Sequence, residues 1–161
     1  IKLGVKIAND HTSAFKRKLA LMQEGEEIFA AQLAGDFVLP DEKSKKLVFI
    51  AGGIGITPFR SMAKYLLDNN DKRNIVLFYA ASSPDAFAYK SLFEKSKSVG
   101  IKPFYISTRI TPDLIKKEVP DFMERVFYLS GPDAMVTFYK KMLLNLGVSH
   151  ASIKTDYFPG Y

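Results

Sequence analysis

From residue 46 to the end of the chain, short apolar runs recur between longer segments whose apolar positions are three or four residues apart. Each run places aliphatic and aromatic residues at consecutive positions and ends in small or polar residues. Continuous runs of this kind are typical of strands that are buried on both faces of a parallel sheet. The pattern therefore predicts five strands, at residues 46–52, 74–82, 102–108, 125–131 and 151–158.

The segments between these runs have the spacing of helices. In the first of them, Phe59, Met62 and Leu66 fall on one stripe. Thr111 suits an N-cap, and Gly147 suits the end of a helix. The predicted helices span residues 57–69, 85–100, 111–119 and 131–147. Because strands alternate with helices, we expect an α/β fold with a doubly wound, five-stranded parallel sheet.

The first 40 residues follow a different pattern. Residues 1–10 alternate apolar and polar positions, which predicts a half-buried strand. Residues 12–25 suit a helix, and residues 26–40 suit a second strand that contains a turn. We therefore expect a partial antiparallel β-barrel over residues 1–40. A polar hinge would join it to a sheet domain over residues 41–161.

Composition narrows the chemistry. The chain has no cysteine, and its two histidines, His11 and His150, are far apart. Disulfides, thiolate metal sites, iron–sulfur clusters and a cysteine nucleophile are therefore excluded, and we expect no metal site. The net charge of +6 indicates a solvated surface, an anionic cofactor or an acidic partner. We expect no nucleic acid, no membrane segment and, without cysteine or a recognisable signal, a cytoplasmic location.

Three glycines, Gly52, Gly53 and Gly55, stand where the first predicted strand meets its helix. Glycine permits a positive φ and has no Cβ that would hold a ligand away from the backbone. The helix N-terminus adds free N–H groups, at the sheet edge where open α/β folds bind ligands. The stretch departs from the usual dinucleotide fingerprint, because Pro58 replaces the third glycine and no acidic residue ends the second strand. The glycines alone leave nucleotide binding and a structural tight turn as alternatives.

The glycine turn belongs to one of five longer motifs, which are spread over nearly the whole chain. In chain order they are "HTSAFKRKLALMQEGEEI", "GDFVLP", "FIAGGIGITPFRSM", "FYLSGPDAMV" and "TDYF". Together they resemble the ferredoxin–NADP reductase family. The first two resemble the helix and the last segment of the family's FAD-binding barrel. The other three resemble the two motifs of its nicotinamide domain and its terminal acidic element.

The resemblance implies an NAD(P)H-dependent flavin oxidoreductase. In this family the nicotinamide domain binds NAD(P)H and passes a hydride to FAD, and the electrons then go to a carrier such as ferredoxin, flavodoxin or a cytochrome. The family's Arg-x-Tyr-Ser/Thr motif, which holds the flavin, has no counterpart here, so flavin binding by this chain alone stays open. Two alternatives remain: a flavin-free nucleotide-binding or sensory domain, and a subunit of a larger electron-transfer complex.

The resemblance also implies roles for individual residues. The glycine turn, with Thr57 and Pro58, would approach the dinucleotide. Ser130, near the nicotinamide C4, and the terminal acid Asp156 would be the catalytic residues. The other implied cofactor contacts are Gly131, Pro132 and Met135 of the second motif, Phe158 and Tyr161 as stacking aromatics, and Ser13 and Ala14 at the flavin pyrophosphate.

Each of these residues has a structural alternative. Thr57 and Ser13 suit helix caps, and Ser130 suits the turn between a strand and a helix. Asp156 suits a solvated surface acid, and Phe158, like Tyr161, suits a core aromatic. The sequence alone does not decide between these roles.

The choice between NADH and NADPH also stays open. A 2′-phosphate requires donors near the ends of the second and third predicted strands, and an acidic residue there would instead bind a free 2′-hydroxyl. The candidate donors are Ser82, Ser83, Lys90, Arg109 and Lys116, and the candidate acid is Asp85.

Overall fold

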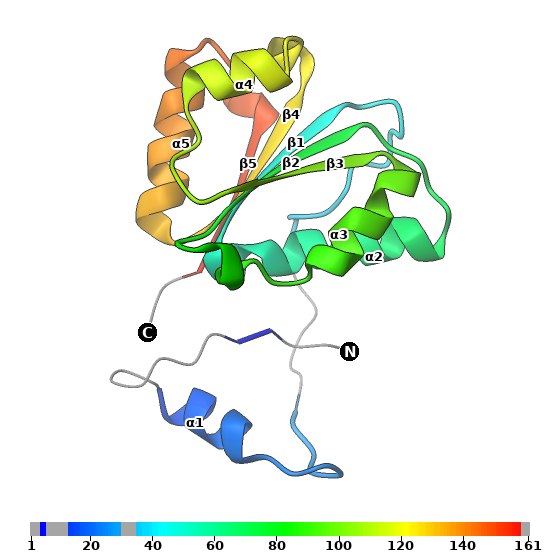
Figure 1. Ribbon diagram of the computed structural model, residues 1–161, viewed down its shortest axis with the longest axis vertical. Helices are drawn as coiled ribbons and strands as arrows, with labels where there is room; N and C mark the ends of the chain where they lie inside the picture. Colours follow the sequence, from blue (N-terminus) through cyan, green and yellow to red (C-terminus); the bar gives the residue numbers. More distant parts are fainter. Residues whose placement is uncertain (1–3, 6–12, 30–34, 159–161) are drawn as a thin grey trace.

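The computed structural model describes residues 4–5, 13–29 and 35–158. A five-stranded parallel sheet lies at its centre, with the strand order β3-β2-β1-β4-β5 (Figure 1). The strands are β1 Leu47–Gly52, β2 Ile75–Ala80, β3 Ile101–Ile106, β4 Val126–Gly131 and β5 Ile153–Tyr157. The predicted doubly wound sheet is confirmed. Its order reverses at β1, and in such sheets the reversal point is where ligands bind.

Helices cover both faces of the sheet (Figure 1). α2 Ile56–Asp68 and α3 Lys90–Lys95 pack on one face, and α4 Pro112–Glu118 and α5 Asp133–Asn145 pack on the other. The 3-10 segments are η1 Gly53–Gly55, η2 Pro84–Ala86, η3 Ser96–Val99, η4 Phe122–Glu124 and η5 His150–Ser152. α1 Ala14–Leu21 lies apart from the sheet.

The central strand, β1, has a continuous apolar sequence because it is buried on both faces of the sheet. Every residue of β1 is buried, and successive side chains point to opposite faces. Phe49 stacks on Phe59 of α2, with the ring centroids 4.5 Å apart. Val48 and Ile50 pack in the separate core on the side of α4 and α5. The sheet therefore has two cores that share one strand.

The prediction of one continuous helix over residues 85–100 is wrong. The segment contains η2, a loop, the short helix α3 and η3. Tyr89, immediately before α3, has a φ of 60°. This left-handed conformation does not continue a right-handed helix. The helix therefore begins only at Lys90.

The predicted strand over residues 26–40 is wrong for the part of this range that the structure describes. Residues 26–29 and 35–40 belong to no strand. Phe37 instead packs edge-on against Tyr128 with the ring centroids 5.2 Å apart, and the Tyr128 hydroxyl donates to the Val38 carbonyl at 2.8 Å. A strand needs a neighbouring strand for its backbone groups, whereas this segment is held by side chains of the sheet domain.

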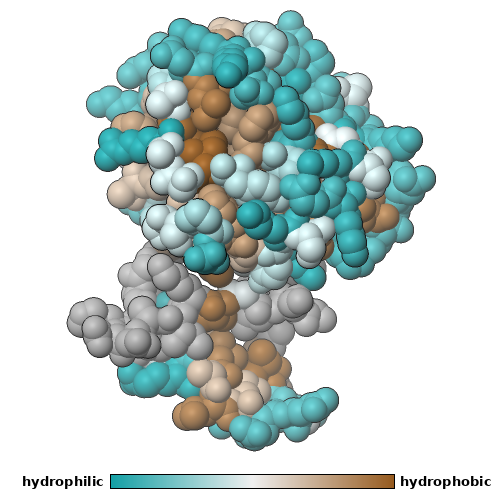
Figure 2. All heavy atoms as spheres, in the orientation of Figure 1, coloured by the Kyte–Doolittle hydropathy of each residue, from teal (hydrophilic) through white to brown (hydrophobic). Residues whose placement is uncertain are grey.

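α1 begins as predicted, because the Ser13 hydroxyl accepts a hydrogen bond from the Lys16 backbone N–H at 3.3 Å. No residue of α1 is buried. Figure 2 shows apolar surface around this helix, where Phe15, Leu21, Ile28 and Phe29 are exposed. The predicted strand over residues 1–10 lies outside the described residues except for positions 4 and 5, so the barrel stays a prediction.

The polar stretch predicted as a hinge is docked onto the sheet domain. Arg73, which is buried, donates through Nη1 to the Pro40 carbonyl at 2.9 Å and through Nε and Nη2 to Asp71 at 3.2 and 3.1 Å. Lys43 forms an ion pair with the same carboxylate at 3.1 Å. Lys46, at the other end, contacts Asp121 at 2.8 Å. Both ends of the stretch are therefore anchored.

Candidate functional site

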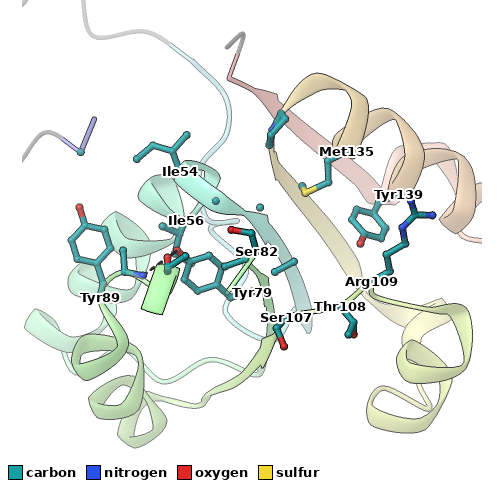
Figure 3. A pocket seen from close by; sticks show the side chains of 18 of the residues that line it. Ile54, Ile56, Tyr79, Ser82, Tyr89, Ser107, Thr108, Arg109, Met135 and Tyr139 are labelled. Carbon is teal, nitrogen blue, oxygen red and sulfur yellow. Dashed lines mark hydrogen bonds between the residues drawn. The ribbon is translucent and has the colours of Figure 1, made fainter. Parts of the chain in front are cut away.

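A cleft of about 960 Å³ lies across the carboxyl ends of β1, β2, β3 and β4 (Figure 3). Six of the residues singled out in the sequence line it: Gly52, Gly53, Ser82, Arg109, Pro132 and Met135. The cleft occupies the reversal point of the strand order, which is the usual ligand-binding position in an open α/β sheet. Its volume is in the range of small-molecule and cofactor sites.

The three glycines of the turn have three different surroundings. A Cβ at Gly52 would lie 2.1 Å from Met135 Sδ, and a Cβ at Gly55 would lie 2.1 Å from the Ser130 carbonyl oxygen. Gly53 has a φ of +52°, and a Cβ there would meet nothing within 4 Å. Gly55 therefore allows the turn to pack on β4 and does not line the cleft. Gly53 keeps an open backbone at the wall of the cleft.

Thr57 and Pro58 serve the start of α2. The Thr57 hydroxyl donates to the Ile54 carbonyl at 3.0 Å, which secures η1 against the helix. Neither residue lines the cleft. At the N-terminus of α2 the Ile56 N–H donates to the Gly53 and Ile54 carbonyls of η1, and Pro58 has no N–H, so the helix dipole is what favours an anion there.

The cleft wall formed after β2 and β3 is polar and solvated. Ser82, Ser107 and Thr108 are exposed hydroxyl residues, and Arg109 is an exposed cation. Figure 3 shows Arg109 beside Tyr139, and its guanidinium carbon lies 5.9 Å from the centroid of the Phe138 ring. The described residues that line the cleft include no carboxylate. This wall therefore suits an anionic, hydrogen-bonding group.

The other candidates for the 2′-position lie outside the cleft lining. Ser83 is half-buried before η2, and Asp85 is exposed within it. The Lys90 ammonium lies over the rings of Phe87 and Tyr105, at 5.6 and 5.1 Å from their centroids. Lys116 lies in the last turn of α4.

The ends of β4 and β5 are drier. Ser130 is fully buried, and its hydroxyl has no hydrogen-bond partner. It pairs in register with Asp156, so the two side chains share one face of the sheet. Burial raises the pKa of the Asp156 carboxyl above its usual value, an effect that the Tyr157 backbone N–H partly offsets.

The terminal segment is tied to the second motif. The Phe158 N–H donates to the Gly131 carbonyl at 3.0 Å. Gly131 itself is closely packed, because a Cβ there would lie 2.7 Å from Met135 Cε. Phe158 is half-buried, and Tyr161 lies outside the described residues. Ser130, Gly131, Asp156 and Phe158 thus form one neighbourhood next to the cleft, although none of them lines it.

Several residues that line the cleft were not identified from the sequence: Tyr79, Tyr89, Ser107, Thr108 and Tyr139. Apolar periodicity assigns the first and last of these to the core. The two hydroxyl residues directly after the third strand were a usable signal, because they occupy the same edge as the glycine turn. Ser13 and Ala14 do not line the cleft either.

A family model described as an oxidoreductase NAD-binding domain matches residues 49–141. Among curated proteins, the chain is 28% identical over 155 residues to a flavohemoprotein of Bacillus cereus. The aligned part covers 85% of this chain and 38% of that protein. It is 31% identical over 157 residues to a flavohemoprotein of Candida albicans, with 87% and 38% covered. The chain thus spans well under half the length of these relatives.

Solved structures share the fold. Flavohemoglobin from Malassezia yamatoensis superimposes with a TM-score of 0.74 at 20% identity, over 96% of this chain and 42% of that one. The H286L mutant of ferredoxin-NADP+ reductase from Plasmodium falciparum gives a TM-score of 0.74 at 19% identity, over 91% and 66%. No helix in the described part of the chain has the length and apolar character needed to cross a membrane.

Proposed function

The chain belongs to the oxidoreductase NAD-binding domain family, and from this premise we propose that residues 46–158 bind a nicotinamide dinucleotide across the carboxyl ends of the strands. The chain would then be the coenzyme-binding part of an NAD(P)H-dependent flavin oxidoreductase. The position of the cleft at the reversal point of the sheet supports this proposal.

The observation that carries the proposal is the open backbone at Gly53. Its φ of +52° disfavours other residues, yet the space that a Cβ would occupy is free. It lies between the end of β1 and the N-terminus of α2, where the helix dipole favours an anion. A diphosphate can therefore lie against this turn without meeting a side chain.

We place the adenosine half of the dinucleotide toward β2 and β3 and the nicotinamide half toward β4 and β5. The exposed hydroxyls and Arg109 suit the charged, hydrated half. The ends of β4 and β5 suit an aromatic ring because Ser130 is fully buried and Asp156 is half-buried. Ser130 is buried and does not line the cleft, so its proposed role is to position the end of β4 beside the ring. It would not be a nucleophile, because no base is hydrogen-bonded to its hydroxyl.

When bound, the coenzyme supplies a hydride for the reduction of a flavin. This chain's residues would orient the ring and exclude water. The hydrogen bond from Phe158 to Gly131 holds the terminal segment against the second motif. The raised pKa of Asp156 extends the pH range over which its carboxyl keeps a proton and can donate a hydrogen bond.

The flavin and the electron acceptor belong to the proposal for the whole protein. The first curated relatives are flavohemoproteins of which this chain covers 38%, so we assign FAD binding to a longer polypeptide or to an assembly with a partner. Ser13 and Ala14, at the N-terminus of α1, would contact the FAD pyrophosphate there. With a net charge of +6, an acidic carrier such as ferredoxin or flavodoxin is the proposed acceptor.

Coenzyme binding is tested by replacing Gly53 with valine. The matched control is Gly25→Val, since Gly25 also has a positive φ of +95° with nothing near a built Cβ but lies outside the cleft. We expect both variants to lose some thermal stability and only Gly53→Val to lose the increase in Tm that NADH or NADPH gives the wild type. An unchanged coenzyme-induced shift in Gly53→Val would remove the turn from the site.

The flavin assignment has a separate test. The purified chain is mixed with FAD, desalted and examined for the flavin absorbance band. Retention of the band by the chain alone would contradict the assignment to a longer polypeptide. A colourless chain whose Tm still rises with NADH would support it, together with flavin retention by the full-length protein.

A further inference from the structure

Two buried tyrosines line the cleft from opposite cores of the sheet domain. Tyr79, on β2, is 1% exposed and belongs to the core beneath α2. Tyr139, on α5, is 4% exposed and belongs to the other core. Figure 3 shows them on opposite sides of the cleft. Both rings are buried in the cores, and close packing there restrains the positions of their hydroxyls.

Tyr139 holds the loop that follows β3. Its hydroxyl accepts a hydrogen bond from the Ile110 backbone N–H at 3.2 Å. Ile110 is buried and directly follows the exposed residues Ser107, Thr108 and Arg109. The preceding residue on α5, Phe138, carries the Arg109 guanidinium over its ring. Two adjacent side chains of α5 thus contact this loop, Tyr139 at its backbone and Phe138 at its charged group.

Tyr79 holds the loop that follows β2. Its hydroxyl accepts from the Ala88 N–H at 3.2 Å and donates to the Ala86 carbonyl at 3.4 Å. Its ring packs edge-on against Phe87, with the centroids 5.1 Å apart. The loop ends in the left-handed Tyr89, a conformation that persists only where surrounding contacts hold it. The Tyr79 hydroxyl bonds the backbone on either side of Phe87, directly before Tyr89.

We propose that Tyr79 and Tyr139 are positioning residues for the adenosine diphosphate part of the coenzyme, and that they act by holding these two loops in their binding conformation. The inference rests on the proposed function and deepens it. The two loops carry most of the exposed polar groups of the cleft. A loop that is ordered before binding loses less conformational entropy when the ligand arrives, so affinity depends on hydroxyls that need not touch the ligand.

The test is the conservative variant Tyr139→Phe, which keeps the ring and removes the hydrogen-bond acceptor. We expect faster amide hydrogen exchange at Ile110 and a Kd for ADP-ribose about five- to tenfold higher, as for the loss of one hydrogen bond. Tyr79→Phe should do the same at Ala88. The matched control is Tyr128→Phe, because Tyr128 is fully buried and its hydroxyl is also hydrogen-bonded to a backbone group, yet it does not line the cleft.

The outcomes separate this inference from the proposed function. If the wild type binds neither NADH nor ADP-ribose, the proposed function fails and the inference fails with it. If the wild type binds and both cleft variants bind equally well, the inference alone is overturned, even if the Ile110 and Ala88 amides exchange faster. If Tyr139→Phe does not fold, Tyr79→Phe decides the matter through the other loop.

Discussion

Two regions at the carboxyl edge of the sheet, the wall of the cleft after β2 and β3 and the neighbourhood beside it at the ends of β4 and β5, differ in how exposed their polar groups are to water. After β2 and β3, the hydroxyl residues Ser82, Ser107 and Thr108 are exposed. At the ends of β4 and β5, Ser130 is fully buried without a partner and Asp156 has a pKa raised by burial. The first region suits a charged, hydrated group. The second is less hydrated at Ser130, which is why we propose the nicotinamide half there.

The largest expected effect compares two neighbouring glycines. Gly55→Ala should lower the free energy of unfolding by about 3 kcal/mol or more, because its Cβ would lie 2.1 Å from the Ser130 carbonyl oxygen in the tightly packed backbone of β4. Gly53→Ala should cost only about 1 kcal/mol, since the space is open and only the positive φ is unfavourable. Urea denaturation measures both. Equal losses of stability in the two variants would show that Gly55 is not packed more closely than Gly53.

The next largest effect is on coenzyme affinity and concerns Arg109, in the cleft wall after β3. Arg109→Ala should raise the Kd for NADPH about tenfold and that for NADH less than about threefold, because a guanidinium contributes most against a 2′-phosphate. Titration of both coenzymes by fluorescence measures the difference. The control is Lys90→Ala, a cation held over two rings and absent from the cleft lining. Equal losses for NADH and NADPH would place Arg109 at the pyrophosphate instead.

The smallest effect is on stability and concerns the buried Ser130 at the end of β4. Ser130→Ala should leave the free energy of unfolding unchanged or raise it by up to about 1 kcal/mol, because it removes a buried hydroxyl that has no partner. The matched control is Ser82→Ala in the cleft wall after β2, which should change stability by less than about 0.5 kcal/mol. Thermal denaturation without ligand measures both. A marked loss in Ser130→Ala would mean that the hydroxyl has a structural partner.

Local chemistry made much of the fold predictable from the sequence. Continuous apolar runs predicted a parallel sheet, because β1 and its neighbours are buried on both faces. Thr111 was predicted as an N-cap, and its hydroxyl accepts from the Leu114 N–H at 3.2 Å. The glycine turn and the second motif were placed at the correct edge of the sheet. These features depend on residues that are close together in the chain.

The remaining features depend on contacts between distant residues. Gly55 is needed because of the Ser130 carbonyl, 75 positions later, which no local pattern reveals. Tyr79 and Tyr139 have the spacing of core residues, and only the tertiary structure turns their hydroxyls toward loop backbones. The break before α3 depends on the left-handed Tyr89, a conformation that helical spacing does not predict.

The anchoring of the linker changes where the molecule can bend. Arg73 donates to the Pro40 carbonyl and Tyr128 donates to that of Val38, so the segment that leads into the polar residues 41–46 is tied to the sheet domain. In a longer protein of this family, these contacts would oppose bending between residues 38 and 46. The first anchor of this stretch on the sheet domain is the ring of Phe37, which packs against Phe59 and Tyr128.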